Sequence, residues 1–155
     1  GKVSIKERTE GTVYRAEVVA SYVEFRVGDL LIPEEPITSC VELVPTDPTV
    51  ATHIAAVQDQ KRIIGQFSVV YLPKGFNDGI LRGNVFRVMK KLDSIGPPIP
   101  DVVAGHMIVI EARPDSATGV VINLTQNLAN GASVLGTEWE EVSEVLSMLP
   151  QCRVQ

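Results

Sequence analysis

The 155-residue sequence contains few of the side chains on which most catalytic and metal sites depend, with only two histidines and two cysteines. It contains none of the common signatures G-x-G-x-x-G, G-x-x-x-x-G-K-[ST], G-x-S-x-G and H-E-x-x-H. The separations between Cys40, His53, His106 and Cys152 match no zinc-ligand spacing. We therefore predict that the protein is not an enzyme and has no catalytic, cofactor-binding or metal-ligating residues.

Basic residues are also too few and too scattered to form a nucleic-acid surface. Lys and Arg number 14 against 19 Asp and Glu, which gives a net charge of −5. The densest basic cluster is Arg87, Lys90 and Lys91, which we interpret as a solvated strand end. No apolar run approaches the ~20 residues that a membrane helix requires. We expect no nucleic-acid partner and no membrane span in this fragment.

Long-range cross-linking is limited to one possible pair of cysteines. Cys40 and Cys152 either form a disulfide in an oxidising compartment or remain two buried thiols in a reducing one. With 45% apolar residues the chain can bury a core without disulfides, as one ordinary domain or two very small ones. Because it opens at Gly1 without Met, we expect a processed or excised fragment, so a missing signal peptide says little about location.

The apolar residues that are present fall in short β-branched and aromatic runs, which predict strands. We expect strand character within Val3–Leu31, including Tyr22–Phe25, and in a hairpin made by His53–Val57 and Ile63–Ile64. Further pairs are expected from Phe67–Leu72 with Asn84–Met89, joined by a tight connection, and from Met107–Ala112 with Gly119–Leu124. The proline-bearing segments Pro33–Thr52 and Lys91–Ala104 read as covering loops, the first with one edge strand at Cys40–Val44.

A short glycine-containing pattern recurs three times, in Phe25–Leu31, Ile80–Val85 and Leu128–Val134. A glycine between two apolar residues suits the corner of a small antiparallel barrel, where backbones crowd, although ordinary turns can match the pattern by chance. We expect Gly75, Gly79 and Gly83 to need positive φ, and Asp78 to close its own turn. The predicted structural turn residues are Gly28, Asp29, Gly75, Asp78, Gly79, Gly83 and Gly131.

The C-terminal segment predicts one helix. Thr137 followed by Glu140 has the spacing of a capping box, and apolar residues recur at helical spacing until Pro150: Trp139, Val142, Val145, Leu146 and Leu149. The predicted fold class is therefore all-β, mainly antiparallel, with one or two small barrels and one C-terminal helix. The expected domains are a β domain over 1–135, with possible halves 1–52 with 92–135 and 53–91, and a helix and tail over 136–155.

The segment His53–Val88 resembles the region that follows the LysM repeat in a group of bacterial LysM-containing cell-envelope proteins. The similar positions are Ile64-Gly65-Gln66-Phe67, Val69-Val70, Leu72, Gly75, Asp78-Gly79-Ile80 and Gly83, preceded by Gly28–Pro33 and followed by Ala104–Val109. Weaker local similarity links the turn to the C-terminal domain of flagellar assembly protein T and to the cell-shape protein MreC. The resemblance covers roughly residues 25 to 135, and the LysM repeat itself is not in the chain.

The resemblance implies a periplasmic or cell-envelope setting and a non-catalytic accessory or interaction domain. Its expected partner is a cell-envelope protein, or peptidoglycan through a LysM repeat elsewhere in the parent protein. We expect the two proline-rich loops to be the contact elements, because rigid loops lose less entropy on binding than flexible ones. A structural or oligomerisation module that pairs through an exposed edge strand is the alternative, and the oligomeric state is left open. A third hypothesis is a hydrolase site built from Asp78, Asp101 and His106.

Overall fold

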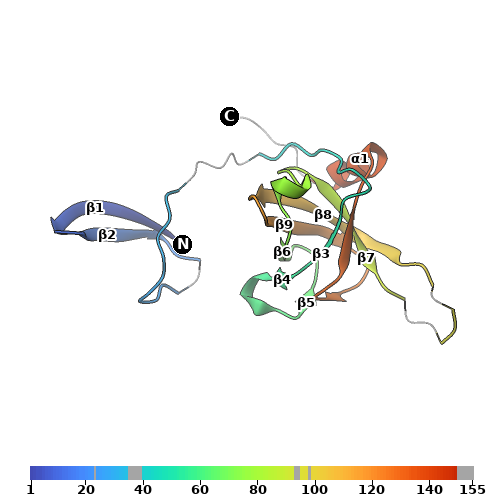
Figure 1. Ribbon diagram of the computed structural model, residues 1–155, viewed down its shortest axis with the longest axis horizontal. Coiled ribbons are helices and arrows are strands. Elements are labelled where there is room, and N and C mark those ends of the chain that lie inside the picture. Colours follow the sequence, from blue (N-terminus) through green and yellow to red (C-terminus); the bar gives the residue numbers. More distant parts are fainter. Residues whose placement is uncertain (23, 35–39, 93–94, 98, 150–155) are drawn as a thin grey trace. The chain divides into compact units, whose positions relative to one another are not determined.

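The computed structural model describes residues 1–22, 24–34, 40–92, 95–97 and 99–149 (Figure 1). Contacts divide the chain into two units, Gly1–Ile37 and Thr38–Gln155. The predicted domains, a β domain over 1–135 and a helix and tail over 136–155, stay predictions. Strands from both possible halves of the β domain, 1–52 with 92–135 and 53–91, share one sheet. The all-β fold class with a C-terminal helix is confirmed.

The first unit is built on a β-hairpin. Strand β1 (Lys2–Glu10) pairs antiparallel with β2 (Val13–Ala20), and Gly11 between them has a positive φ of 56°. The expected strand at Tyr22–Phe25 is not formed at its described positions, because Tyr22, Glu24 and Phe25 lie outside any strand. Val23 lies outside the described residues.

The second unit contains a curled antiparallel sheet. Among the residues described it has seven strands, in the order β3 (Ala51–His53), β11 (Ser133–Gly136), β7 (Val85–Lys90), β8 (Val102–Ala112), β9 (Ala117–Leu124), β6 (Val69–Leu72) and β4 (Ala56–Val57). Two shorter strands, β5 (Ile63–Ile64) and β10 (Leu128–Ala129), pair separately. The sheet forms a half-barrel whose edge strands are β3 and β4 (Figure 1).

Two expected strand pairings are wrong. The predicted hairpin of His53–Val57 with Ile63–Ile64 does not form, because β4 pairs with β6 and β5 pairs with β10. Strands β6 and β7 do not pair either, since β9 and β8 lie between them in the sheet. By contrast, the predicted pairing of β8 with β9 is confirmed.

The predicted loops are also shorter than expected. Val102–Ala104, assigned to the second proline-bearing loop, belongs to β8. The edge strand expected at Cys40–Val44 is reduced to a single parallel bridge between Val44 and Asn84. Prolines on both sides of this short run remove the donors that a longer ladder would need.

Close backbone contacts explain why glycine is needed in the β6–β7 connection. A Cβ atom on Gly75 would lie 1.9 Å from the carbonyl oxygen of Arg113, and one on Gly83 would lie 2.0 Å from that of Glu42. The connection therefore packs against other segments instead of turning back as a hairpin. It includes the 3₁₀ turn η2 (Phe76–Asp78), and a second such turn, η1 (Gln58–Gln60), follows β4.

Alternating side chains build a core on each face of the sheet. On one face the fully buried side chains include Phe86, Val88, Met107, Val109 and Val121. On the other face Val85, Ile108 and Ile122 pack with Leu43 and with Val142 and Val145 of the helix α1 (Trp139–Met148). Figure 1 shows α1, in red, beside the sheet.

The start of α1 differs from the sequence prediction. The N-cap residue is Glu138, and no side chain caps the helix. The expected capping box of Thr137 with Glu140 is therefore wrong. The Thr137 hydroxyl is buried and donates instead to the carbonyl oxygen of Val85, 3.0 Å away. The helix itself, across one face of the β core, is confirmed.

Candidate binding groove

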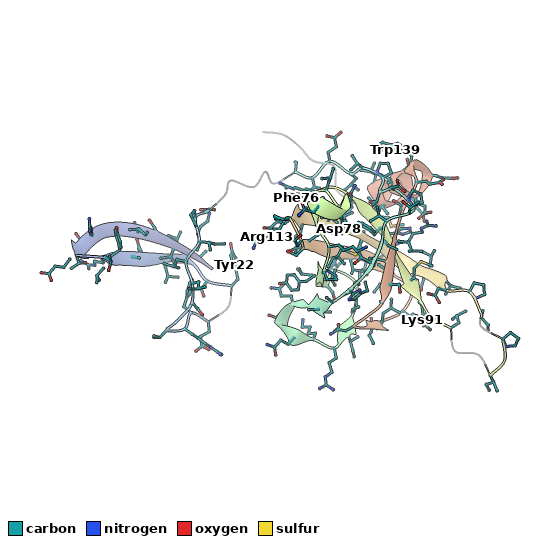
Figure 2. The ribbon with its side chains drawn as sticks, viewed as in Figure 1. Tyr22, Phe76, Asp78, Lys91, Arg113 and Trp139 are labelled. Carbon is teal, nitrogen blue, oxygen red and sulfur yellow. The ribbon has the colours of Figure 1, made fainter. Side chains whose placement is uncertain are left out.

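The three residues of the hydrolase hypothesis lie in different parts of the second unit. Asp78 accepts a hydrogen bond from the amide of Gly75 at 3.1 Å, in a turn that packs against Arg113 (Figure 2). Asp101 is exposed before the first residue of β8, whereas Arg113 follows the last. His106 is buried within β8, five residues from Asp101, which is on the order of 16 Å along an extended strand. This geometry gives no support to a shared reaction centre.

The predicted turn glycines have structural environments. Gly28, Gly79, Gly83 and Gly131 have positive φ values of 102°, 83°, 93° and 91°. The positive φ expected at Gly75 is wrong, since its φ is −139° and its ψ −150°. Asp29 accepts a hydrogen bond from the amide of Arg26 at 2.9 Å. These residues shape turns. The predicted disulfide stays a prediction, because Cys152 lies outside the described residues.

A groove of about 580 Å³ lies where the loop before β3 meets the start of α1. No residue pattern in the sequence pointed to it, since its two walls lie about 90 residues apart. The available signals were two prolines in the covering loop and the single tryptophan of the chain. The lining residues are Pro45, Thr46, Asp47, Pro48, Thr137, Glu138, Trp139 and Glu140.

The loop wall of the groove is fixed to the sheet by hydrogen bonds. The buried Thr46 hydroxyl donates to the carbonyl oxygen of Val85 at 2.7 Å. The side-chain amide of Asn84, also buried, donates to the carbonyl oxygen of Pro45 at 3.2 Å. Because proline already restricts the backbone of this loop, the wall is held in one conformation.

The helix wall is fixed by the contacts of Gly136, which directly precedes it in the chain. A Cβ atom on Gly136 would lie 2.0 Å from the carbonyl oxygen of Asp47, so the two walls touch through their backbones. The amide of Gly136 donates to Val50 at 3.0 Å, and the Arg87 guanidinium donates to the Gly136 carbonyl oxygen at 2.8 and 3.1 Å. The groove is therefore preformed and needs little ordering before it can bind.

A polar cluster holds α1 against the sheet beneath the groove. Glu141 of α1 contacts the paired strands β8 and β7, with one carboxylate oxygen 3.3 Å from Nε2 of His106 and the other 3.7 Å from Nη1 of Arg87. The amide of His106 donates to the side-chain oxygen of Asn123 at 2.7 Å. His106 therefore has a structural environment, as its position in an apolar run indicated.

The groove combines an aromatic surface with negative charge. Trp139 is 61% exposed although it opens the helix (Figure 2). Asp47, Glu138 and Glu140 line the same groove, and no Lys or Arg is among the described lining residues. The hydroxyl of Thr49, and then its backbone amide, donate to Asp47 and lower the pKa of that carboxyl below its usual range. The groove thus keeps negative charge in mildly acidic conditions.

These features suit the binding of a cationic group. An exposed indole ring flanked by carboxylates attracts an ammonium or guanidinium group, through the π face and through charge.

Across the described part of the chain, no three His, Cys, Asp or Glu side chains gather closely enough to hold a metal ion. Comparisons with protein-family models, curated proteins and solved structures found no match. In the part of the chain described, no helix has the length and apolar character needed to cross a bilayer.

Proposed function

We propose that this chain is a non-catalytic interaction domain of a bacterial cell-envelope protein, working outside the cytoplasm. The setting is supported by the resemblance of His53–Val88 to the region after the LysM repeat. The observation that carries the binding role is the exposed Trp139 in a wall fixed by buried hydrogen bonds. The indole ring and two prolines form apolar surface in this open groove, and apolar surface rimmed by charged side chains is a feature of protein-binding sites.

The occupant proposed for the groove is an extended polypeptide segment of another envelope component that carries a Lys or Arg side chain. Charge complementarity supports this choice, because Asp47, Glu138 and Glu140 line the groove together with Trp139. The two prolines of the loop wall offer apolar surface to the backbone and neighbouring side chains of such a segment. The cation would lie over the ring of Trp139, where desolvation strengthens its attraction to the π face.

Trp139 is the single tryptophan and therefore reports directly on its own groove. The test titrates the protein with proline-flanked pentapeptides that differ only in their central residue, which is Lys, Arg, norleucine or Glu. The Lys and Arg peptides are expected to change the fluorescence at about two- to fivefold lower concentration than the norleucine peptide. Equal responses to the Lys, Arg, norleucine and Glu peptides would overturn the proposal.

A matched pair of variants locates the binding. Glu140→Gln removes a charge from the groove, whereas Glu144→Gln removes the same charge from an exposed position of α1 outside it. Only Glu140→Gln is expected to lower the affinity for the Lys peptide. Added salt should reduce the difference in affinity between the two variants, because exposed charges are screened. Equal effects of the two substitutions would mean that net charge, and not the groove, attracts the peptide.

Association with peptidoglycan is proposed only through a LysM repeat of the parent protein. A pull-down of the present chain with purified sacculi tests this directly. The expected result is no binding, which leaves protein recognition as the role of the domain. Retention on the sacculi, abolished by Trp139→Ala, would instead assign glycan recognition to the groove.

The alternative role, an oligomerisation module, is favoured by a separate observation in the first unit. There, strands β1 and β2 expose large apolar side chains, among them Ile5, Tyr14 and Val18. Both roles can belong to one chain, since the groove lies in the second unit.

A further inference from the structure

The β1–β2 hairpin is an incomplete piece of sheet. Ile5, Tyr14 and Val18 are 61%, 53% and 54% exposed, so the hairpin buries little of its own apolar surface. An isolated two-stranded hairpin is at best marginally stable in water, and three or more strands with an apolar face are needed for independent stability. The hairpin therefore requires additional strands or a cover.

The two faces of the hairpin have different chemistry. The register places Val3 opposite Val18, Ile5 opposite Ala16 and Arg8 opposite Tyr14, which gives one mainly apolar face. The other face carries the ion pairs Lys6–Glu17 and Glu7–Arg15, at 2.9 and 3.3 Å, with the exposed Val13 at the start of β2. The charged side chains already form ion pairs within the hairpin, whereas the apolar side chains stay exposed. An added strand therefore has to cover or extend the apolar face.

The edge of β2 is better suited to a new strand than that of β1. In the part of the chain described, β2 has β1 on one side and no strand on the other. The register skips Lys6 and Thr9 within β1. On β2 it skips only Val19, near the end of the strand, and residues 13–18 have consecutive partners. Bulges blunt a sheet edge, and a regular run rich in β-branched residues leaves it open to pairing.

We infer that β2 pairs antiparallel with β2 of a second copy of this chain, about a two-fold axis through Ala16. The residues at equal distances on either side of Ala16 are complementary: Arg15 and Glu17 have opposite charges, and Tyr14 and Val18 are both large and apolar. Antiparallel pairing centred on Ala16 sets Arg15 opposite the partner's Glu17 and Tyr14 opposite the partner's Val18. Each of these pairs occurs twice, as an isologous interface requires.

The pairing keeps each face of the hairpin continuous. Tyr14, Ala16 and Val18 stay on the apolar face, because side chains alternate and the register pairs even-numbered residues with even-numbered ones. On the polar face, Arg15 and Glu17 extend the existing ion pairs into rows of alternating charge that cross all four strands. Opposite charges and aromatic–β-branched pairs are the cross-strand combinations that stabilise antiparallel sheets.

The same operation on the edge of β1 gives a poorer match. A two-fold axis between Lys6 and Glu7 would pair those two charges, but it would set Ile5 opposite the partner's Arg8 and Val3 opposite the partner's Glu10. Apolar residues would then meet charges along a bulged edge. Charge complementarity and regularity therefore both select β2.

The dimer goes beyond the proposed groove function and is tested without it. The full chain is examined by analytical ultracentrifugation over a range of concentrations, in a reducing buffer that removes any intermolecular disulfide. A reversible monomer–dimer equilibrium is expected. A monomer at every concentration would overturn the inference, while peptide binding at Trp139 would be unaffected.

Charge reversal tests the register. Each single substitution, Arg15→Glu or Glu17→Arg, sets like charges opposite each other at both symmetric pairs. Each is expected to raise the dissociation constant of the dimer on the order of tenfold. A mixture of the two variants sets opposite charges at both pairs and should restore the dimer as a heterodimer. Failure of the mixture to recover association would contradict the pairing, and circular dichroism of each variant shows whether the rest of the fold is intact.

Cross-linking gives an independent readout. In a background with Cys40→Ser and Cys152→Ser, Ala16→Cys would face its own copy at about 4.5–5.5 Å between Cα atoms, which a disulfide can bridge. Val18→Cys is the matched control, because its copy would lie on the order of 14 Å away along the strand. Cross-linking at position 16 and not at 18 is expected, and the reverse pattern would overturn the register.

Discussion

Thr46 and Thr137 donate hydrogen bonds to the same atom, the carbonyl oxygen of Val85, at 2.7 and 3.0 Å. The two hydroxyls come from opposite walls of the groove and both are buried. A single backbone position of β7 therefore sets the spacing between the covering loop and the start of α1. Pre-organisation of the groove depends on this shared acceptor.

The first prediction concerns that acceptor. Thr46→Val and Thr137→Val should each lower the free energy of unfolding by about 1 kcal/mol, the net contribution of one hydrogen bond. The double variant removes both of these donors from the buried carbonyl, and should cost more than the sum of the two single variants. Urea denaturation of the four proteins measures the cycle. Strict additivity would mean that the two hydroxyls act independently.

The second prediction concerns Asp47. Because hydrogen bonds from Thr49 lower the pKa of this carboxyl in the folded chain, they favour folding above the unfolded-state pKa. That contribution is lost as the pH falls through the folded-state pKa. Thr49→Val removes the hydroxyl and should raise the pKa of Asp47, whereas Thr49→Ser should keep it low. Carboxyl chemical shifts followed by NMR over an acid titration distinguish the two, and equal pKa values would refute the assignment.

The third prediction separates two glycines of the β6–β7 connection. Both have positive φ, but a Cβ atom on Gly83 would meet the backbone of Glu42 at 2.0 Å, while one on Gly79 meets nothing within 4 Å. Gly79→Ala should cost about 1–2 kcal/mol, from backbone strain alone. Gly83→Ala should cost more than about 3 kcal/mol, because backbone has to move as well. Thermal or urea unfolding that gave equal losses would contradict the close approach.

The fourth prediction concerns the attachment of α1. Glu141→Ala should lower the free energy of unfolding by about 1–2 kcal/mol, because it removes a carboxylate that contacts both the buried His106 and Arg87. Glu144→Ala, on the exposed side of the same helix, should change it by less than about 0.5 kcal/mol. Urea unfolding compares them, and similar losses would show that helix propensity outweighs the polar cluster.

Local features were predictable from the sequence. The spacing of Val142 and Val145 placed the helix, and these two side chains are the ones it buries. The β8–β9 hairpin was also predictable, because its strands are adjacent in the chain and joined by the short turn at Pro114–Ser116. In both cases the residues that determine the structure are close together in the sequence.

Pairings between distant segments were not predictable. The glycines between β6 and β7 have the character of a tight hairpin turn, but Gly75 is needed for contact with Arg113, about forty residues later. Thr137 likewise has the residue type and position of a cap, yet its hydroxyl reaches Val85 on another strand. A local sequence pattern cannot show whether a glycine or threonine serves its own turn or contacts a distant segment. The groove depends on contacts between distant segments, so the sequence did not predict it.

The most direct test of the binding role is a map of amide chemical shifts during titration with the Lys-centred pentapeptide. The expected perturbations lie at Thr46, Asp47 and residues 137–140, together with the indole N–H of Trp139, and they should be absent with the Glu-centred peptide. Perturbations confined to other surfaces, or none with any of the peptides, would contradict a cation-binding groove at this site.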